Sequence, residues 1–280
     1  MSRGTLRSPD HPSAPAAVRI KCPDVIQHRV DLRTDEGTLD AYLFRPDGAG
    51  PFDTAQGGSW PPVIVYMDAF GIRPQLGEMA QRLASHGYVV ALPNLYHRTP
   101  FAPFDPKQVA VEGPERARFK GMVSSINGPM VMRDTAAVLA HLDSLPSVRA
   151  LKLGALGYCM GGGYALAAAG TFPDRVAVAA SFHGGSLATD KPDSPHLLAR
   201  HMRARVYVGA AGIDPTFPDE QRQRLETALA EAGVAHTIET YENAKHGFAV
   251  NGHLVYDREA SERHWERLLQ LLGETLQSAS

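Results

Sequence analysis

Short apolar runs alternate with helical patterns through most of this chain of 280 residues. Continuous apolar runs are typical of strands buried on both faces of a parallel sheet. We expect such strands at residues 63–67, 88–92, 151–156, 176–182, 205–209 and 235–241. Helices are predicted at about 76–83, 130–145, 219–232 and 257–277, and in the alanine-rich stretch after residue 163. This alternation predicts an α/β fold with a mostly parallel, doubly wound sheet and helices on both faces.

Three further segments complete the predicted organisation. Residues 27–34 and 38–44 are expected to form a hairpin around the turn sequence Asp35-Glu36-Gly37. Residues 94–127 show no regular pattern and are long for a connection, which predicts an irregular, cap-like segment. Residues 1–20, which include three prolines between positions 9 and 15, are expected to be a disordered leader. One domain is therefore predicted for residues 21–280.

Composition argues against several classes of partner. The net charge is −2, from 28 basic and 30 acidic side chains, so neither a nucleic acid nor a membrane is expected as a partner. No apolar stretch reaches the roughly 18 residues of a membrane span, and the N-terminus lacks the apolar core of a secretory signal. The two cysteines, Cys22 and Cys159, predict a reducing cytoplasmic setting without a disulfide framework.

A predicted strand and a predicted helix are separated by the sequence Gly157-Tyr158-Cys159-Met160-Gly161. Glycines two residues before and after a nucleophile allow strand and helix to meet in a tight turn that exposes it. The helix N-terminus favours a reactive thiolate at Cys159, and the Met160 N–H is a candidate oxyanion donor. A buried, inert cysteine in a glycine turn is the alternative. A phosphate-binding loop fits poorly, because neither Gly-x-Gly-x-x-Gly nor Gly-Lys-Ser/Thr occurs here.

Two candidate partners of Cys159 follow it in the chain. Asp214 lies 55 residues after Cys159, beyond the strand predicted at 205–209, and His246 lies 32 residues further, beyond the strand predicted at 235–241. Because catalytic groups gather at the carboxyl ends of parallel strands, we expect the three side chains to meet. The order nucleophile, acid, base is also that of α/β-hydrolases. Taken singly, Asp214 fits an Asp-Pro turn and His246 is one of 12 histidines.

The chain resembles the dienelactone hydrolase family from about Pro62 to the last predicted helix. The stretches that carry the resemblance are PVIVYMDAFG, HGYVVALPNLYHR, LGALGYCMGGGYAL, FHGG and AKHGF. The resemblance implies an α/β-hydrolase fold with a sheet of about eight strands, and no cofactor. It also implies hydrolysis of an enol-lactone or a related small-molecule ester by a Cys-His-Asp triad, whose roles fall on Cys159, His246 and Asp214.

The family's Glu-x-Phe-Gly stretch corresponds here to Asp68-Ala69-Phe70-Gly71. In the family, the acid helps to control the thiol, and the N–H of the next residue completes the oxyanion hole. The resemblance gives these roles to Asp68 and Ala69, although aspartate is one methylene shorter than glutamate. A cap at the end of a strand is the alternative role for Asp68.

Substrate contacts are implied by the same resemblance. The family binds a substrate carboxylate with two arginines, and Val250 stands at the position of one of them, four residues after His246. Arg116 falls at the position of the other, with Arg118 beside it; a solvated cap surface is the alternative for both. Because a bidentate arginine is a strong carboxylate contact, its absence at Val250 argues for a different or less anionic substrate.

His183, at the end of a predicted strand, and Tyr96 are further candidate contacts, with a packed core histidine as the alternative for His183. The spacing of the histidines predicts no metal site.

The predicted reaction is acyl transfer in two steps. Cys159 attacks the ester carbonyl, the N–H groups of Met160 and Ala69 stabilise the oxyanion, and His246, oriented by Asp214, moves the proton. The same triad also fits a thioesterase or an acyltransferase. Redox chemistry is disfavoured because no second cysteine is nearby, and a non-catalytic binding scaffold remains a further alternative. The oligomeric state is left open.

Overall fold

The computed structural model describes residues 25–47, 60–148 and 152–277. The leader predicted at 1–20, Cys22 and the first residue of the strand predicted at 151–156 lie outside these ranges. Across the described residues, no helix is both long enough and apolar enough to cross a membrane.

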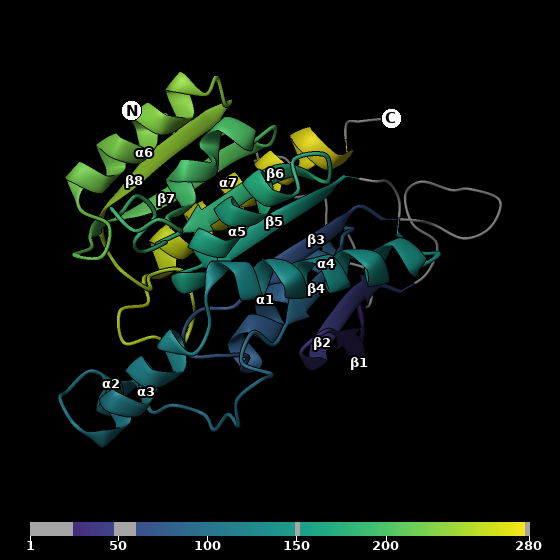
Figure 1. Ribbon diagram of the computed structural model, residues 1–280, viewed down its shortest axis with the longest axis horizontal. Coiled ribbons are helices and arrows are strands. Elements are labelled where there is room, and N and C mark those ends of the chain that lie inside the picture. Colours follow the sequence, from purple (N-terminus) through teal and green to yellow (C-terminus); the bar gives the residue numbers. More distant parts are fainter. Residues whose placement is uncertain (1–24, 48–59, 149–151, 278–280) are drawn as a thin grey trace, which may run out of the picture.

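The described strands form one eight-stranded sheet, as predicted (Figure 1). They are β1 (Val25–Thr34), β2 (Gly37–Pro46), β3 (Pro62–Tyr66), β4 (Val89–Pro93), β5 (Leu153–Tyr158), β6 (Val176–Phe182), β7 (Arg205–Ile213) and β8 (His236–Lys245). Their order across the sheet is β1-β2-β4-β3-β5-β6-β7-β8. β1 and β2 form an antiparallel hairpin, β2 pairs antiparallel with β4, and every later neighbour pair is parallel.

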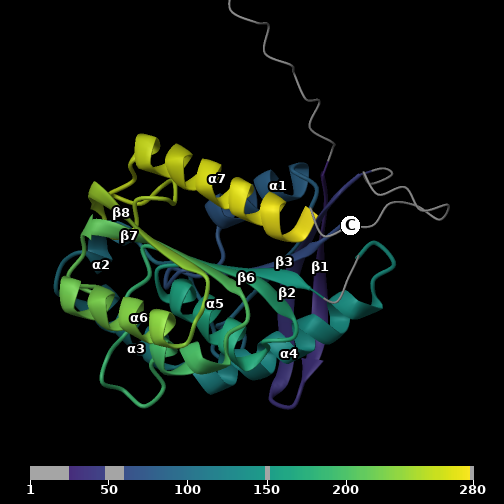
Figure 2. The same ribbon diagram turned by 90° about the horizontal axis from the view of Figure 1, so that it is seen from above.

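Helices cover both faces of the sheet, as expected for a doubly wound fold. Figure 2 shows α1 (Pro74–Ser85) and α7 (Arg258–Leu272) on one face, with α4 (Gly128–Ser144), α5 (Met160–Thr171) and α6 (Asp219–Glu231) on the other. Because both faces are covered, β3, β4 and β5 are buried at every position. The edge strand β1 instead exposes charged residues such as Arg29 and Asp31, which disfavour pairing with another chain.

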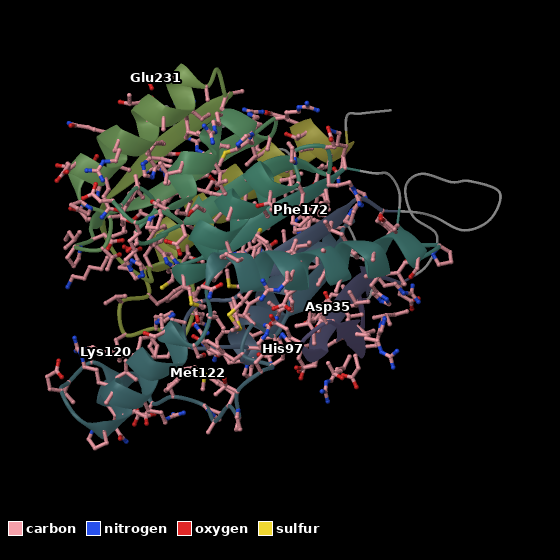
Figure 3. All side chains as sticks on the ribbon, in the orientation of Figure 1. Asp35, His97, Lys120, Met122, Phe172 and Glu231 are labelled. Carbon is pink, nitrogen blue, oxygen red and sulfur yellow. The ribbon has the colours of Figure 1, made fainter. Side chains whose placement is uncertain are left out.

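The segment predicted to be irregular at 94–127 contains two helices, so this prediction was wrong in part. They are α2 (Pro106–Val109) and α3 (Pro114–Ser124), at the lower left of Figure 1; Lys120 and Met122 mark α3 in Figure 3. Met122 is the buried residue of α3, and the apolar residues Phe119, Met122 and Val123 span little more than one turn, which is too short a pattern to reveal a helix. Ion pairs one turn apart, such as Glu115–Arg118, support it instead.

Candidate active site

The turn between β5 and α5 holds Cys159 in a strained backbone conformation. Its φ is 54° and its ψ is −119°, a left-handed region that costs a non-glycine residue on the order of 1–3 kcal/mol. A Cβ at Gly157 would lie 1.9 Å from the carbonyl oxygen of Gly161, and a Cβ at Gly161 would lie 2.3 Å from that of Tyr66. Both glycines are therefore required by the close approach of strand and helix, as the sequence predicted.

The three residues expected to meet do meet. β7 ends at Ile213 and β8 at Lys245, so Asp214 and His246 directly follow two neighbouring parallel strands. His246 Nε2 lies 3.0 Å from Cys159 Sγ, and His246 Nδ1 lies 2.7 Å from Asp214 Oδ2. The chain of contacts thus runs from a buried carboxylate through an imidazole to the sulfur.

Thr216 belongs to this group although the sequence analysis did not name it. Its N–H and its hydroxyl both donate to Asp214 Oδ1, at 2.8 and 2.7 Å, so the carboxylate is fixed in place for His246. The local signal was an aspartate followed two residues later by threonine at the end of a strand, a pattern typical of a side-chain-capped turn.

The charges of the site favour the protonated, imidazolium form of His246. Burial alone would lower the pKa of His246, but the negative charge of Cys159 and the hydrogen bond to Asp214 raise it to about 10. Burial would raise the pKa of Asp214, but the hydrogen bonds from His246 and Thr216 outweigh this effect and hold it below its usual value. At neutral pH, His246 therefore carries a proton that it can deliver.

Two backbone N–H groups are candidates for binding an oxyanion next to the sulfur. Met160 is the first residue of α5, where N–H groups have no partner within the helix. Ala69 lies in the loop after β3 and lines the same pocket as Cys159. The hydroxyl of Tyr96 donates to the Ala69 carbonyl oxygen at 2.9 Å, so Tyr96 contacts this loop from the side of β4. Ala69 and Met160 thus line the same pocket as Cys159, and Tyr96 contacts the Ala69 loop.

Asp68 is completely buried and is held by a cluster of its own. Arg73 donates to both of its carboxylate oxygens at 2.7 Å, His253 Nε2 lies 3.1 Å from Oδ2, and the Phe70 N–H donates to Oδ1 at 2.9 Å. Burial would raise the pKa of Asp68, but the hydrogen bonds from His253 and Arg73 lower it to about 2. Within the described part of the chain, these are its hydrogen-bond partners, and Cys159 is not among them.

His183 is buried next to the turn that carries Cys159. Its φ is 39°, its side chain is fully buried, and its Nδ1 accepts a hydrogen bond from the Cys159 N–H at 3.2 Å. Burial, and then the charge of His246, hold the pKa of His183 well below its usual value, so the ring is neutral. Among the described residues, its Nε2 has no hydrogen-bond partner.

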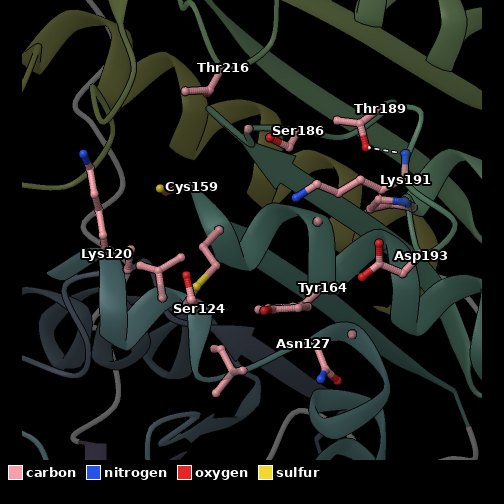
Figure 4. Close-up of a pocket in the computed structure, with 18 of the residues that line it drawn as sticks. Lys120, Ser124, Asn127, Cys159, Tyr164, Ser186, Thr189, Lys191, Asp193 and Thr216 are labelled. Carbon is pink, nitrogen blue, oxygen red and sulfur yellow. Dashed lines mark hydrogen bonds between the residues drawn. The ribbon is translucent and has the colours of Figure 1, made fainter. Parts of the chain in front are cut away.

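A pocket of about 850 Å³ opens in front of Cys159 and His246. One side comes from α3 and the start of α4, with Lys120, Ser124 and Asn127 (Figure 4). The opposite side comes from the loop after β6, where Ser186, Thr189, Lys191 and Asp193 are drawn (Figure 4). Pockets of roughly 300–1,000 Å³ are the usual size for small-molecule ligands, so this one is large enough for a substrate.

A model of the dienelactone hydrolase family matches residues 39–276. The chain belongs to the dienelactone hydrolase family. It is 29% identical over 218 residues to a "Putative carboxymethylenebutenolidase" from Synechocystis sp., covering 76% of this chain and 86% of the relative. It is 27% identical over 247 residues to a "Probable 2-oxo-3-(5-oxofuran-2-ylidene)propanoate lactonase" from Bradyrhizobium sp., covering 86% and 91%. Membership of this family makes the chain a hydrolase.

Solved structures agree with the dienelactone hydrolase fold. A protein titled "Putative Dienelactone Hydrolase" from Klebsiella pneumoniae aligns with a TM-score of 0.77 at 24% identity, covering 90% of this chain and 99% of that one. At this identity the likeness concerns the fold, and it matches the eight-stranded α/β arrangement described above.

Arg116 and Arg118, the two candidates for one arginine of the dienelactone hydrolase family, point in different directions here. Two residues apart on a helix differ by about 200° in direction, so Arg116 and Arg118 cannot share one face of α3. Arg116 lines the pocket and pairs with Glu112 at 3.0 Å. Arg118 is bound to Glu115 at 2.7 Å and lies over the Phe104 ring, outside the pocket lining.

A substrate contact by Arg116 or Arg118 stays a prediction; of the two, Arg116 is the one that lines the pocket. Val250, at the other arginine position, is completely buried. Across the described ranges, no three His, Cys, Asp or Glu side chains are grouped as a metal site.

Proposed function

We propose that this hydrolase cleaves small esters or lactones with Cys159 as nucleophile, through an acyl-enzyme. The observation that carries the proposal is the contact of 3.0 Å between Cys159 Sγ and His246 Nε2 at the head of α5. Acyl transfer requires a nucleophile, a base within hydrogen-bond reach and an acid that orients the base. Cys159, His246 and Asp214 supply these three parts.

In the first half-reaction, the Cys159 thiolate attacks the carbonyl carbon. The N–H groups of Met160 and Ala69 donate to the oxyanion, and each such donor is worth about 3 kcal/mol. His246 starts as an imidazolium because its pKa is raised to about 10. As the carbon–oxygen bond breaks, Nε2–H gives its proton to the leaving oxygen, and a thioester remains on Cys159.

In the second half-reaction, the neutral His246 takes a proton from water, and the hydroxide attacks the thioester carbonyl. Collapse of this intermediate expels the Cys159 thiolate and releases the acid. The thiolate and the imidazolium are thereby restored. Asp214 keeps Nδ1 protonated throughout, so Nε2 always faces the sulfur and the substrate.

Asp68, Tyr96 and His183 act in this proposal as positioning residues. Asp68 fixes the turn that carries Ala69 by accepting from the Phe70 N–H, and Tyr96 holds the Ala69 carbonyl. His183 accepts from the Cys159 N–H and so braces the nucleophile turn from below. We further propose a cytoplasmic setting, where a thiol such as that of Cys159 stays reduced.

The proposal is tested by hydrolysis of p-nitrophenyl acetate, p-nitrophenyl butyrate and a dienelactone. We expect Cys159→Ala to lower kcat/KM by at least about 10³-fold, because the nucleophile is removed. Cys22→Ala is the matched control, since it removes the other cysteine of the chain and should leave the rates unchanged.

Mass spectrometry after a rapid acid quench gives a second readout. A butyryl group is expected on the peptide that contains Cys159 when wild type is mixed with p-nitrophenyl butyrate. Turnover that persists in Cys159→Ala, or an acyl group on another residue, would reject Cys159 as the nucleophile.

A further inference from the structure

The pocket continues from Cys159 along one face of α5. Gly163 and Ala167 line it, four and eight residues after Cys159, so they lie on the same side of the helix. A helix rises 1.5 Å per residue, which places Ala167 about 12 Å beyond the nucleophile along the axis. Because Gly163 has no side chain and Ala167 has only a methyl group, α5 leaves space at these two positions, while Met160 and Tyr164 of the same helix also line the pocket.

Part of the pocket wall that faces away from the loop after β6 is apolar. It is formed by Phe119 and Val123 of α3, by Ile126 in the connection to α4, and by Phe70 from the loop after β3. Ring contacts join Phe70 to Phe119 and fix this wall to the site, with centroids 5.0 Å apart. A substrate group that lies between these four side chains and α5 meets carbon, whereas Lys120 and Ser124 of α3 line other parts of the pocket.

The charged residues of the pocket do not form a carboxylate clamp. Val250 is completely buried, Arg118 is bound to Glu115 and lies outside the pocket lining, and Arg116, which lines the pocket, is paired with Glu112. The Lys120 side chain is 62% exposed, and Lys191 is also exposed, so both lie at the solvent side of the pocket.

From this geometry, we propose that the preferred substrates are uncharged esters or lactones. Their apolar group lies along α5, between Ala167 and the apolar side chains that include Val123; this space is called the groove below. This inference rests on the proposed function and adds the substrate class. Each buried methylene is worth about fourfold in binding, so a chain that fills the two turns of α5 strengthens binding to the transition state considerably.

Two homologous series test the proposal: p-nitrophenyl alkanoates from acetate to octanoate, and alkyl acetates from methyl to octyl, all below their solubility limits. For wild type, we expect kcat/KM to rise about fourfold per methylene in one of the two series. The series that rises identifies whether the acyl group or the alcohol group of the ester occupies the groove. A comparator of matched length, the p-nitrophenyl monoester of suberic acid, should react at least tenfold more slowly than the octanoate.

Two substitutions each place a larger side chain in the groove, Ala167→Leu on α5 and Val123→Phe on α3. Each should lower the ratio of long-chain to acetate kcat/KM at least tenfold in the series that rises. Val111→Phe is the matched control, because Val111 lies in the same cap segment but is 61% exposed and outside the pocket lining. Since the two substitutions enter from different elements, loss of folding in one leaves the other to decide.

The outcomes separate this inference from the proposed function. Rates that depend on Cys159 but are flat with chain length in both series, or that favour the suberate monoester, would overturn the substrate class and leave the nucleophile in place. Equal ratios in wild type and both filled variants would also overturn it. No turnover of any ester by folded, reduced wild type would instead reject the proposed function itself.

Discussion

The Asp214–His246 pair and the Asp68–His253 pair use the same two residue types, and both aspartates are buried. They differ in the third group that faces the imidazole. His246 Nε2 contacts Cys159 Sγ at 3.0 Å, whereas His253 Nε2 contacts an Arg73 nitrogen at 3.0 Å. The first pair therefore contacts the sulfur of the candidate nucleophile, and the second pair contacts the guanidinium of Arg73.

The two pairs also differ in what their protons can do. The pKa of His246 is raised to about 10 by Cys159 and Asp214 despite burial, so its proton is held next to the position of a leaving group. The pKa of Asp68 is lowered to about 2 by His253 and Arg73 despite burial, so this carboxylate stays charged at neutral pH. We therefore regard the first pair as the proton carrier and the second as a brace for the Ala69 turn.

The largest expected difference in kcat between the two pairs comes from replacing the aspartate of each pair by asparagine. Asp214→Asn should lower kcat about 10⁴-fold, because an amide no longer selects the correct tautomer of His246. Asp68→Asn should lower kcat by at most about 10²-fold, through a displaced Ala69 donor. The rate of Cys159 alkylation by iodoacetamide separates the roles: it should fall with Asp214→Asn alone. Equal losses in both variants would place Asp68 in thiol activation.

Stability should show the opposite ranking. Asp68→Asn removes the counter-charge of the partly buried Arg73 and breaks the hydrogen bonds of a buried carboxylate, so we expect the free energy of unfolding in urea to fall by about 3 kcal/mol. Asp174→Asn is the control, because it removes an exposed ion pair with Arg203 and should cost less than about 1 kcal/mol. A cost for Asp68→Asn as small as the control would mean that the cluster braces nothing.

The pH dependence distinguishes the two pairs at opposite ends of the scale. The folded pKa of His246 is raised, so its stabilising contribution is complete below its unfolded value near 6.5 and is lost as pH rises through about 10. The folded pKa of Asp68 is lowered, so its contribution is present above its unfolded value near 3.8 and is lost as pH falls through about 2.

The same proton should appear in the rates. Alkyl esters need a protonated leaving group, so their turnover should fall about tenfold per pH unit above pH 10, whereas p-nitrophenyl esters should fall less. The ratio of ethyl acetate to p-nitrophenyl acetate turnover between pH 7 and 11 measures this. A ratio that stays constant across the range contradicts His246 as the proton donor.

The smallest expected effect is that of Tyr96→Phe. It removes the hydrogen bond to the Ala69 carbonyl and leaves that oxygen buried, which should cost about 1 kcal/mol of stability and a few-fold in kcat with unchanged KM. Thermal unfolding and steady-state kinetics check both values. A rise in KM alone would show that Tyr96 contacts substrate rather than the loop.

The sheet and the meeting of Cys159, Asp214 and His246 could be predicted because their signals are local. Apolar runs identify buried strands, and glycines at 157 and 161 identify the turn. By contrast, the buried Asp68 contacts His253, which lies 185 positions away in the sequence. No local sequence pattern predicts such a contact. The helix α3 was missed because its apolar residues, Phe119, Met122 and Val123, cover only about one turn.

The glycines around Cys159 have a consequence for how such a chain diverges over evolutionary time. Gly157 and Gly161 admit no Cβ, so the backbone of the turn is closed to variation. Position 159 itself is different, because serine differs from cysteine by one atom and occupies the same space. Substitutions that alter the reaction while keeping this turn are therefore expected at the nucleophile itself or at pocket-lining positions such as Val123 and Ala167. The backbone turn that presents the nucleophile does not accept a side chain at either of these two glycines.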